Sequence, residues 1–260
     1  MPVKISDIAG AMEKIAPKQY AADWDNVGLL VGNGGEAVNN VLIALDATNA
    51  VIDEAAGKRA GLIITHHPVI FKPIKSVAQS DPLGAKIIRL IKNDIAVFSA
   101  HTNFDSAEGG TNDVLCSILG LTGVKRILAD GAAMVGETGG LPVEMTAGAL
   151  EEKLKILLKS KKITLHGESS AKLNKIAVCA GGGSKQEYMK EVKDLGGDCY
   201  ITGDVRYHDW RYAEELGLVL IDAAHEATET PALYALAERL NGVFYEDGVK
   251  FFVSETAGML

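Results

Sequence analysis

Short apolar runs rich in β-branched residues recur along this chain, and segments with helical periodicity separate many of them. Most runs lack the alternation of polar and apolar positions that marks a strand with one wet face. They therefore predict strands covered on both sides, as in a parallel sheet flanked by helices. The expected strands are residues 27–32, 40–47, 61–67, 95–101, 162–167, 175–181, 198–204, 218–225, 242–248 and 250–255.

The helical segments complete the pattern of an α/β protein. They are expected at residues 1–17, 49–60, 83–94, 148–160, 186–196 and 232–240. A weak internal repeat of strand, helix, strand, helix and strand runs through residues 41–105 and again through 176–229. We therefore expect two related three-layer lobes with mostly parallel sheets and a metal site in the cleft between them.

The join between the lobes is expected in the glycine-rich stretch around residues 126–142. This gives an N-terminal α/β lobe at 1–128 and a C-terminal α/β lobe at 129–260. The C-terminal segment of the second lobe is a candidate to pack back on the first.

Charge and cysteine content narrow the class of protein. A net charge of -8 argues against broad nucleic-acid binding, which needs a basic surface. No stretch approaches the roughly 20 apolar residues of a membrane span, and the charged N-terminal segment is unlike a signal peptide. The three cysteines lie in apolar segments without CxxC spacing, which favours reduced core residues in a cytoplasmic protein.

Two adjacent histidines, His66 and His67, end the apolar run at residues 61–67. Neighbouring residues of a strand point to opposite faces, so these two cannot both be core side chains of one face. At the end of a parallel strand the backbone direction loosens, and both imidazoles can turn toward the same edge. Two neutral nitrogen donors at one edge indicate a metal site.

Other polar residues stand at equivalent places, directly after predicted strands. Ligands of open parallel sheets bind beyond the carboxyl ends of the strands. His225 and Glu229 are four residues apart, so they share a face if a helix begins at or before His225. Thr228, Thr230 and Pro231 instead resemble a second helix start, which leaves the local geometry open. The residues at strand ends are Asp46, His66, His67, His101, Asp204 and His225.

Each of these features also has an ordinary structural explanation. A single histidine at a strand end is more often a hydrogen-bonded or solvent-exposed residue than a ligand. Asp105 and Glu229 can serve as helix caps or first-turn acids. Residues 181–184, GGGS, resemble an anion-binding turn but lack the lysine of a phosphate loop, which favours a plain tight turn. His166 lies in a polar turn.

Seven blocks of this chain resemble the signature blocks of the Nif-three-like family, whose members are also named GTP cyclohydrolase 1 type 2 homologues. The match covers nearly the whole chain in order, and the HHP, HTNFD and HxxxE blocks are specific in combination. The blocks are DWDNVGLLVG (23–32), LDAT (45–48), ITHHP (64–68), SAHTNFD (99–105), GGTND (109–113), TGDVRYHD (202–209) and DAAHEATE (222–229).

The resemblance implies two α/β lobes, a dinuclear metal centre between them and a toroidal homohexamer. It also implies that His101 lies close to the metal centre and that Asp25, Asp46, Asp204 and His208 lie near the cleft. Ala224 departs from the glycine found in many relatives. The metal ligands implied by the family's motifs are His66, His67, Asp105, His225 and Glu229.

The chemistry of these donors agrees with two metal ions. Five protein ligands exceed the three that a catalytic zinc takes, and a carboxylate can bridge two ions. Mixed imidazole and carboxylate donors suit Zn, Fe, Mn, Co or Ni without selecting among them. We therefore expect two divalent ions per subunit. His101 and Asp46 are the candidate catalytic residues, because either can orient a ligand imidazole through its second nitrogen.

The expected function is a dinuclear metal-dependent hydrolase of a small-molecule substrate, either a nucleotide or another phosphorylated compound. Opening of the guanine ring of GTP is the instance that the family name implies. Candidate phosphate contacts are Lys72, Lys75 and Arg206, although each is more commonly a solvated surface charge. The alternative is a metal-binding or regulatory scaffold protein without turnover. A role in nucleic-acid processing is disfavoured by the acidic charge balance.

Overall fold

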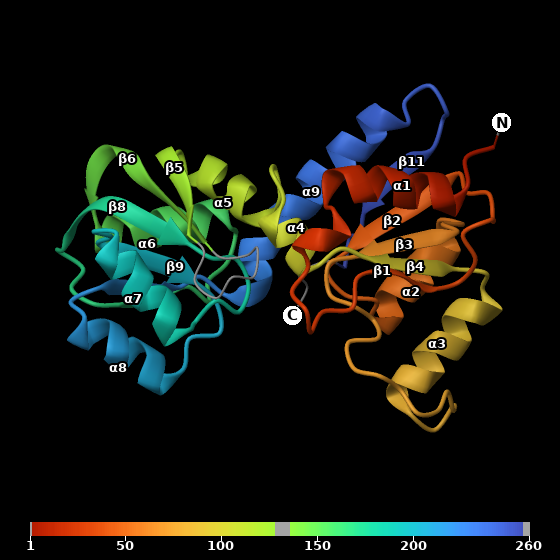
Figure 1. Cartoon of the computed structure of the whole chain (residues 1–260), viewed down its shortest axis with the longest axis horizontal. Helices are drawn as coiled ribbons and strands as arrows, with labels where there is room; N and C mark the ends of the chain where they lie inside the picture. The colour runs from red at the N-terminus through yellow and green to blue at the C-terminus, as the bar shows by residue number, and fades with distance from the viewer. Residues whose placement is uncertain (1, 128–135, 257–260) are drawn as a thin grey trace. The chain divides into compact units, whose positions relative to one another are not determined.

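The computed structural model describes residues 2–127 and 136–256, which form two compact units (Figure 1). Unit 1 holds residues 1–108 and 233–260, and unit 2 holds residues 109–232. In the described residues, none of the helices combines the length and the apolar character needed to cross a membrane.

Unit 1 is built on a five-stranded sheet with the order β1-β4-β3-β2-β11. All of its strands are parallel except β1, which pairs antiparallel with β4 at one edge. Its elements are α1 (Ile5–Ile15), η1 (Lys18–Tyr20), β1 (Gly28–Val31), β2 (Asn40–Ala44), α2 (Asn49–Gly57), β3 (Leu62–Thr65), α3 (Pro82–Lys92), β4 (Ala96–Ser99), α4 (Thr102–Ser106) and β11 (Lys250–Val253).

Helices cover both faces of this sheet. Figure 1 shows α2 and α3 on one face and α1 on the other. Ile52 of α2 and Leu90 of α3 pack against Leu42, Ile63 and Val97 of the central strands. Both faces of β2, β3 and β4 are buried, which explains why the sequence shows unbroken apolar runs there.

Unit 2 is built on a six-stranded mixed sheet with the order β5-β6-β8-β9-β10-β7. The three central strands β8, β9 and β10 are parallel, and the flanking strands are antiparallel. Its elements are α5 (Thr111–Leu119), β5 (Thr122–Ile127), β6 (Gly136–Thr146), α6 (Ala147–Leu157), β7 (Thr164–His166), β8 (Lys172–Val178), α7 (Gln186–Asp194), β9 (Cys199–Thr202), α8 (Tyr207–Glu215), β10 (Val219–Asp222) and α9 (His225–Val243).

The central strands of unit 2 also separate two helical layers. Along β8, Ile176 and Val178 face α5 and α6, whereas Ala177 and the following Cys179 face α7 and α8. This alternation is the two-residue period of a strand with an apolar layer on each side. Both units are therefore three-layered, as the sequence predicts.

The internal repeat has a counterpart in the topology. In unit 1, β2, α2, β3, α3 and β4 form three adjacent parallel strands with connecting helices. In unit 2, β8, α7, β9, α8 and β10 repeat that order. In each unit a helix that carries candidate ligands follows the third strand.

The expected boundary at residues 128 and 129 differs from the division of the structure. The chain leaves unit 1 after Glu108, because α5 buries Leu115 and Leu119 in the core of unit 2. It returns at Leu233, within α9, and β11 pairs with β2. Of the expected join at 126–142, residues 128–135 lie outside the described part, and residues on either side belong to the antiparallel strands β5 and β6.

One predicted strand is wrong. Residues 242–248, GVFYEDG, do not form a strand, because α9 continues through Val243 and a turn follows. Phe244 is buried with its ring 5.6 Å from that of Phe251, so the aromatic residues serve the core of unit 1 rather than a sheet. The second helix start near Pro231 is also not observed, since α9 contains Pro231 in its interior.

The three cysteines lie where the sequence suggests. Cys116, Cys179 and Cys199 are all buried and unbridged in unit 2. Burial raises the pKa of the Cys199 thiol far above its ordinary value, so this residue is an inert part of the core.

Candidate metal-binding residues

The strand ends of unit 1 carry the imidazoles that the sequence singled out. Asp46 follows β2, His66 and His67 follow β3, and His101 follows β4. The backbone amides of His66 and His67 donate to the carbonyls of Ala44 and Leu45, so both residues are held beside the end of β2. The adjacent histidines thus occupy the edge at which parallel sheets bind ligands.

The three imidazoles of unit 1 converge. The ring centroids of His66 and His67 are 5.1 Å apart, and His101 lies 5.1 Å from the first and 5.6 Å from the second. One ring nitrogen from each lies within 4.8 Å of the others, which is close enough for shared coordination of an ion. The two neighbouring histidines therefore do turn toward the same place.

Every one of these rings uses its Nδ1 atom in a hydrogen bond to an oxygen that can only accept. Nδ1 is therefore the donor, and the lone pair of a neutral ring lies on Nε2. The pairs are His66 with the carbonyl of Ala100 at 3.0 Å, His67 with Asp46 at 3.1 Å and His101 with Asp25 at 2.9 Å.

Asp25 is the most enclosed of these partners. Its side chain is fully buried, and besides His101 it accepts hydrogen bonds from the amide of Thr102 at 3.1 Å and from its hydroxyl at 2.5 Å. Burial by itself raises the pKa of the Asp25 carboxyl, but the hydrogen bonds from His101 and Thr102 outweigh it and the pKa lies below its ordinary value. Asp25 is thus an ionised anchor for His101.

Asp105 lies on α4 and supplies a carboxylate to the same group. Its Oδ1 is 3.5 Å from Nε2 of His66, and both residues are buried. A buried carboxylate beside imidazole nitrogen atoms suits a cation better than it suits a helix cap. Unit 1 thus brings together His66, His67, His101 and Asp105, with Asp46 and Asp25 behind the rings.

Unit 2 presents a smaller set at the start of α9. His225 is the first residue of this helix and Glu229 lies one turn later, with His225 Nε2 and Glu229 Oε1 3.1 Å apart. His225 Nδ1 donates to Asp204, which follows β9, at 2.7 Å. The shared helical face expected for His225 and Glu229 is therefore observed.

The charge around His225 is strongly negative. The hydrogen bond to Glu229, against the opposing effect of burial and with further help from Asp204, raises the pKa of His225 to about 9. Glu229 is only 3% exposed. In the metal-free protein a proton therefore balances two carboxylates at neutral pH, and a divalent cation can replace it.

A set of glycines makes room for these side chains, and sequence reasoning missed their role. A Cβ atom on Gly181 would lie 2.2 Å from Glu229 Oε1, and one on Gly182 would lie 3.2 Å from Asp204 Oδ2. A Cβ on Gly203 would lie 2.7 Å from the backbone of His225. The GGGS run is therefore a cradle for His225 and Glu229, and a run of glycines after a predicted strand is the signal that could have indicated it.

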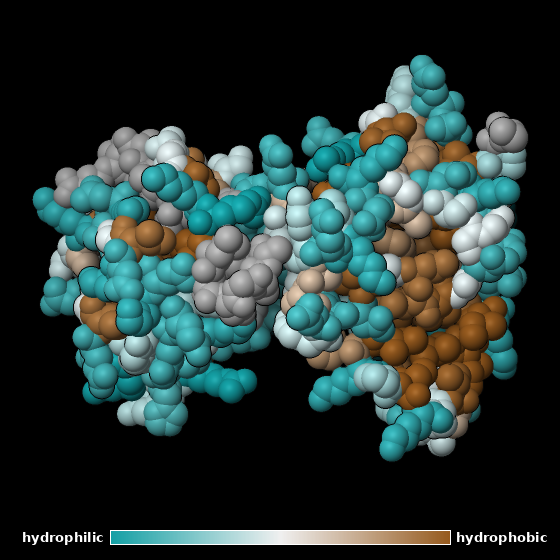
Figure 2. Space-filling view, viewed as in Figure 1, coloured by the Kyte–Doolittle hydropathy of each residue, from teal (hydrophilic) through white to brown (hydrophobic). Residues whose placement is uncertain are grey.

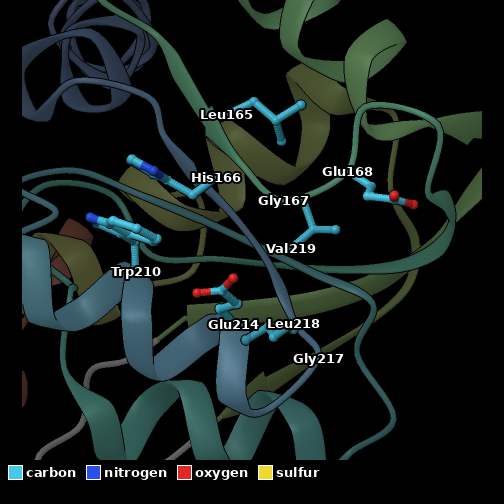
Figure 3. A pocket seen from close by; sticks show the side chains of 9 residues that line it. All are labelled: Leu165, His166, Gly167, Glu168, Trp210, Glu214, Gly217, Leu218 and Val219. Carbon is cyan, nitrogen blue, oxygen red and sulfur yellow. The ribbon is translucent and has the colours of Figure 1, made fainter.

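Unit 2 holds two further histidines. His208 is the second residue of α8, four residues after Asp204, and its ring lies against that of Tyr207. His166 lines a cavity of about 420 Å³ together with Trp210, and their rings are nearly parallel, as Figure 3 shows. Val219 at the start of β10 also lines this cavity, whereas His225 follows the other end of that strand. The cavity is thus separate from the donors at the strand ends.

Comparison with known proteins assigns the family. A model of the family described as Duf34/NIF3 (NGG1p interacting factor 3) matches residues 3–258. The chain belongs to the DUF34/NIF3 family. It is 39% identical over 260 residues to a GTP cyclohydrolase 1 type 2 homolog of Clostridium perfringens, a match that covers 98% of this chain and 97% of the relative.

Other proteins are similar over nearly their full length. A GTP cyclohydrolase 1 type 2 homolog of Clostridium acetobutylicum is 38% identical over 254 residues, which cover 96% of this chain and 94% of that protein. The crystal structure of a Bacillus cereus protein related to NIF3 superposes with a TM-score of 0.91 at 26% identity, covering 98% of this chain and 97% of the other.

The residues present fit divalent metal ions. Three imidazoles and a buried carboxylate in unit 1, and one imidazole with a buried carboxylate in unit 2, are the donors that such ions take. The acceptors behind the four rings are the orienting partners that accompany metal-ligating histidines.

Proposed function

We propose that this chain is a dinuclear metal-dependent hydrolase of a nucleotide or another phosphorylated small molecule. The residues that would hold the two ions come from both units: His66, His67, Asp105, His225 and Glu229. One observation carries the proposal. Each of the four imidazoles has its Nδ1 atom committed to a carboxylate or carbonyl oxygen, so Nε2 would be left for a cation in His66, His67 and His225 and for a proton in His101.

The course of the chain supports shared use of these donors. Asp105 stands three residues before Glu108, where the chain leaves unit 1, and Glu229 stands three residues before Ala232, where it returns. The two carboxylates of the proposed ligand set thus lie close to the two points at which the chain passes between the units. Both would hold the ions and balance part of their positive charge.

Bound divalent ions would supply activation of water at neutral pH and an electrophile for a substrate oxygen. The residues of the chain itself would orient the metal ligands and move protons. Asp46 positions His67, and Asp204 positions His225. His101, backed by the ionised carboxylate of Asp25, is the candidate catalytic base, because its imidazole lies among the ligands and can pass a proton toward that carboxylate.

Substrate charge and self-association belong to the same proposal. Lys72, Lys75 and Arg206 are exposed and remain our candidates for phosphate contacts.

Figure 2 shows apolar surface gathered over β1 and α3, where Leu29 and Ile91 are 38% and 58% exposed. Such a surface favours association between copies, and we propose a toroidal homohexamer in the cytoplasm.

The test is substrate profiling of the metal-loaded protein against a panel of nucleotides and phosphoesters. We expect hydrolysis of at least one compound, and loss of that activity in Asp105→Ala and His225→Ala with folding retained. Glu246→Ala removes an exposed carboxylate in the turn after α9 and is the matched control. Tight metal binding without turnover across the panel would instead support the metal-binding scaffold.

A further inference from the structure

Two exposed aromatic side chains stand beside the imidazoles of unit 1. Trp24 is 60% exposed and Phe71 is 46% exposed, and their ring centroids are 5.7 Å apart. His101 lies 5.9 Å from the first ring and 6.3 Å from the second. The pair therefore borders His101 and, through it, the cluster of imidazoles in unit 1.

Partly buried polar contacts hold this aromatic pair in place. Asp25, next to Trp24, is fixed by its hydrogen bonds to His101 and Thr102. Asn26 donates from Nδ2 to the carbonyl of Ile70, the residue before Phe71, at 2.6 Å. The segments that carry the two rings are thus tied to each other and to the start of α4, so the rings are presented to solvent by a fixed backbone.

The exposure of these rings requires an explanation. A large aromatic side chain gains stability by burial, and here two of them are held outside the core. Exposed aromatic rings next to a polar site are typical platforms for planar ligands, because every nucleobase or related ring has a π-face that can stack. The contact of both rings with His101 places such a platform beside the donors.

We propose that Trp24 and Phe71 form a wall on which a planar heteroaromatic ring of the substrate stacks, while its polar part reaches the imidazoles of unit 1. This inference rests on the proposed function and adds the ring as the recognised chemical feature. Charged residues of the same loops, Lys72 and Lys75 after Phe71 and Asp23 before Trp24, are exposed and leave the wall accessible.

The composition of the chain offers a clean spectroscopic test, because Trp24 and Trp210 are its only tryptophans. Trp210 lines the cavity of unit 2, and in Trp210→Phe the emission reports on Trp24 alone. Metal-loaded Trp210→Phe is titrated with guanosine 5′-monophosphate and, separately, with ribose 5-phosphate, which carries the same sugar phosphate without a ring system. Metal content is measured on every sample.

Stacking predicts saturable quenching of Trp24 by the nucleotide and none by ribose 5-phosphate. In the same background, Phe71→Leu should weaken binding of the nucleotide roughly tenfold, and Phe71→Tyr should retain it. The metal content of both variants should equal that of the parent. These results together would establish the ring as the feature that the wall recognises.

Three results would overturn the wall. The first is equal quenching by both probes, and the second is no quenching by either while metal is bound. The third is a Trp24 emission that changes with protein concentration in the absence of ligand, together with a smaller assembly in Phe71→Leu. That result would mean that the aromatic pair is an interface between copies of the chain. Absence of bound metal in the parent protein would count against the proposed function instead, and the ring dependence would still be read from the two probes.

Discussion

The two units carry their candidate ligands in different electrostatic settings. In unit 1 three imidazoles lie together with Asp105, and each ring donates to its own acceptor, which is a carbonyl for His66 and a carboxylate for His67 and His101. In unit 2 a single imidazole, that of His225, lies between Glu229 and Asp204. The first set is a group of imidazoles that already lie together, whereas in the second the raised pKa of His225 means that a metal ion has to displace a proton.

The way in which the donor side chains are held in place also differs between the two units. The donors of unit 1 are fixed by hydrogen bonds from neighbouring strand ends, with Thr65 and Ser99 hydrogen-bonded at 2.7 Å near those ends. The donors of unit 2 lie against backbone that carries no side chain, at Gly181, Gly182 and Gly203. Substitution of one of these glycines should therefore displace the candidate ligands of unit 2 directly.

The largest effect is expected from Gly181→Ala. Its Cβ would meet Glu229 Oε1, and φ at this residue is +69°, so we expect about 1–2 kcal/mol lower stability and a loss of metal affinity of about 100-fold. Gly196→Ala is the control, because φ is +77° there and no atom lies within 4 Å of the new Cβ. Equal metal affinity in the two variants, measured with a competing chelator, would contradict the cradle.

Removal of an orienting carboxylate should have the next largest effect. Asp46→Asn and Asp204→Asn keep the side-chain shape but withdraw the charge behind His67 and His225, so each should weaken metal binding about 10–100-fold. Calorimetric titration of the two variants compares the units directly. An unchanged affinity in both would show that these contacts do not orient ligands.

The pH dependence should distinguish the units. Since the pKa of His225 is raised to about 9, its proton stabilises the metal-free fold fully below about pH 6.5, and this contribution is lost as pH rises through 9. Metal affinity should therefore rise by about tenfold per pH unit between pH 7 and 9, for one displaced proton. Asp204→Asn removes one cause of the raised pKa of His225, so the rise in metal affinity should level off at a lower pH in that variant. A metal affinity that does not change with pH in the unsubstituted protein would exclude proton displacement.

The smallest effect concerns the backbone before His225. Ala224 has φ +62°, a left-handed conformation that costs a non-glycine residue about 1–2 kcal/mol. Ala224→Gly removes that strain but makes the unfolded chain more flexible, so we expect a gain of up to about 1 kcal/mol in the free energy of unfolding. Urea denaturation measures it, and a loss of stability would mean that the methyl group of Ala224 contributes more through packing.

Much of the site could be predicted because its residues stand at strand ends. Unbroken apolar runs revealed β2, β3 and β4, and the polar residues after them followed from the geometry of parallel sheets. The HxxxE spacing gave the shared helical face of His225 and Glu229. These inferences depend on local pattern alone, which a single sequence contains.

Other features depend on contacts between distant segments and were missed. The aromatic run in residues 242–248 resembles a strand, yet the pairing of β11 with β2 occupies that edge and Phe244 packs beneath it. The role of Gly181 depends on Glu229, 48 positions later in the chain, and the exposure of Trp24 depends on the hydrogen bonds of Asp25 and Asn26. No periodicity signals such contacts.

Anomalous X-ray scattering from crystals of the natively purified protein, recorded at the absorption edge of its bound metal, tests the central claim most directly. We predict two anomalous peaks per chain about 3.5–4 Å apart, with ligands from both His66 and His67 of unit 1 and His225 and Glu229 of unit 2. A single peak ligated within one unit, or none, would contradict the account.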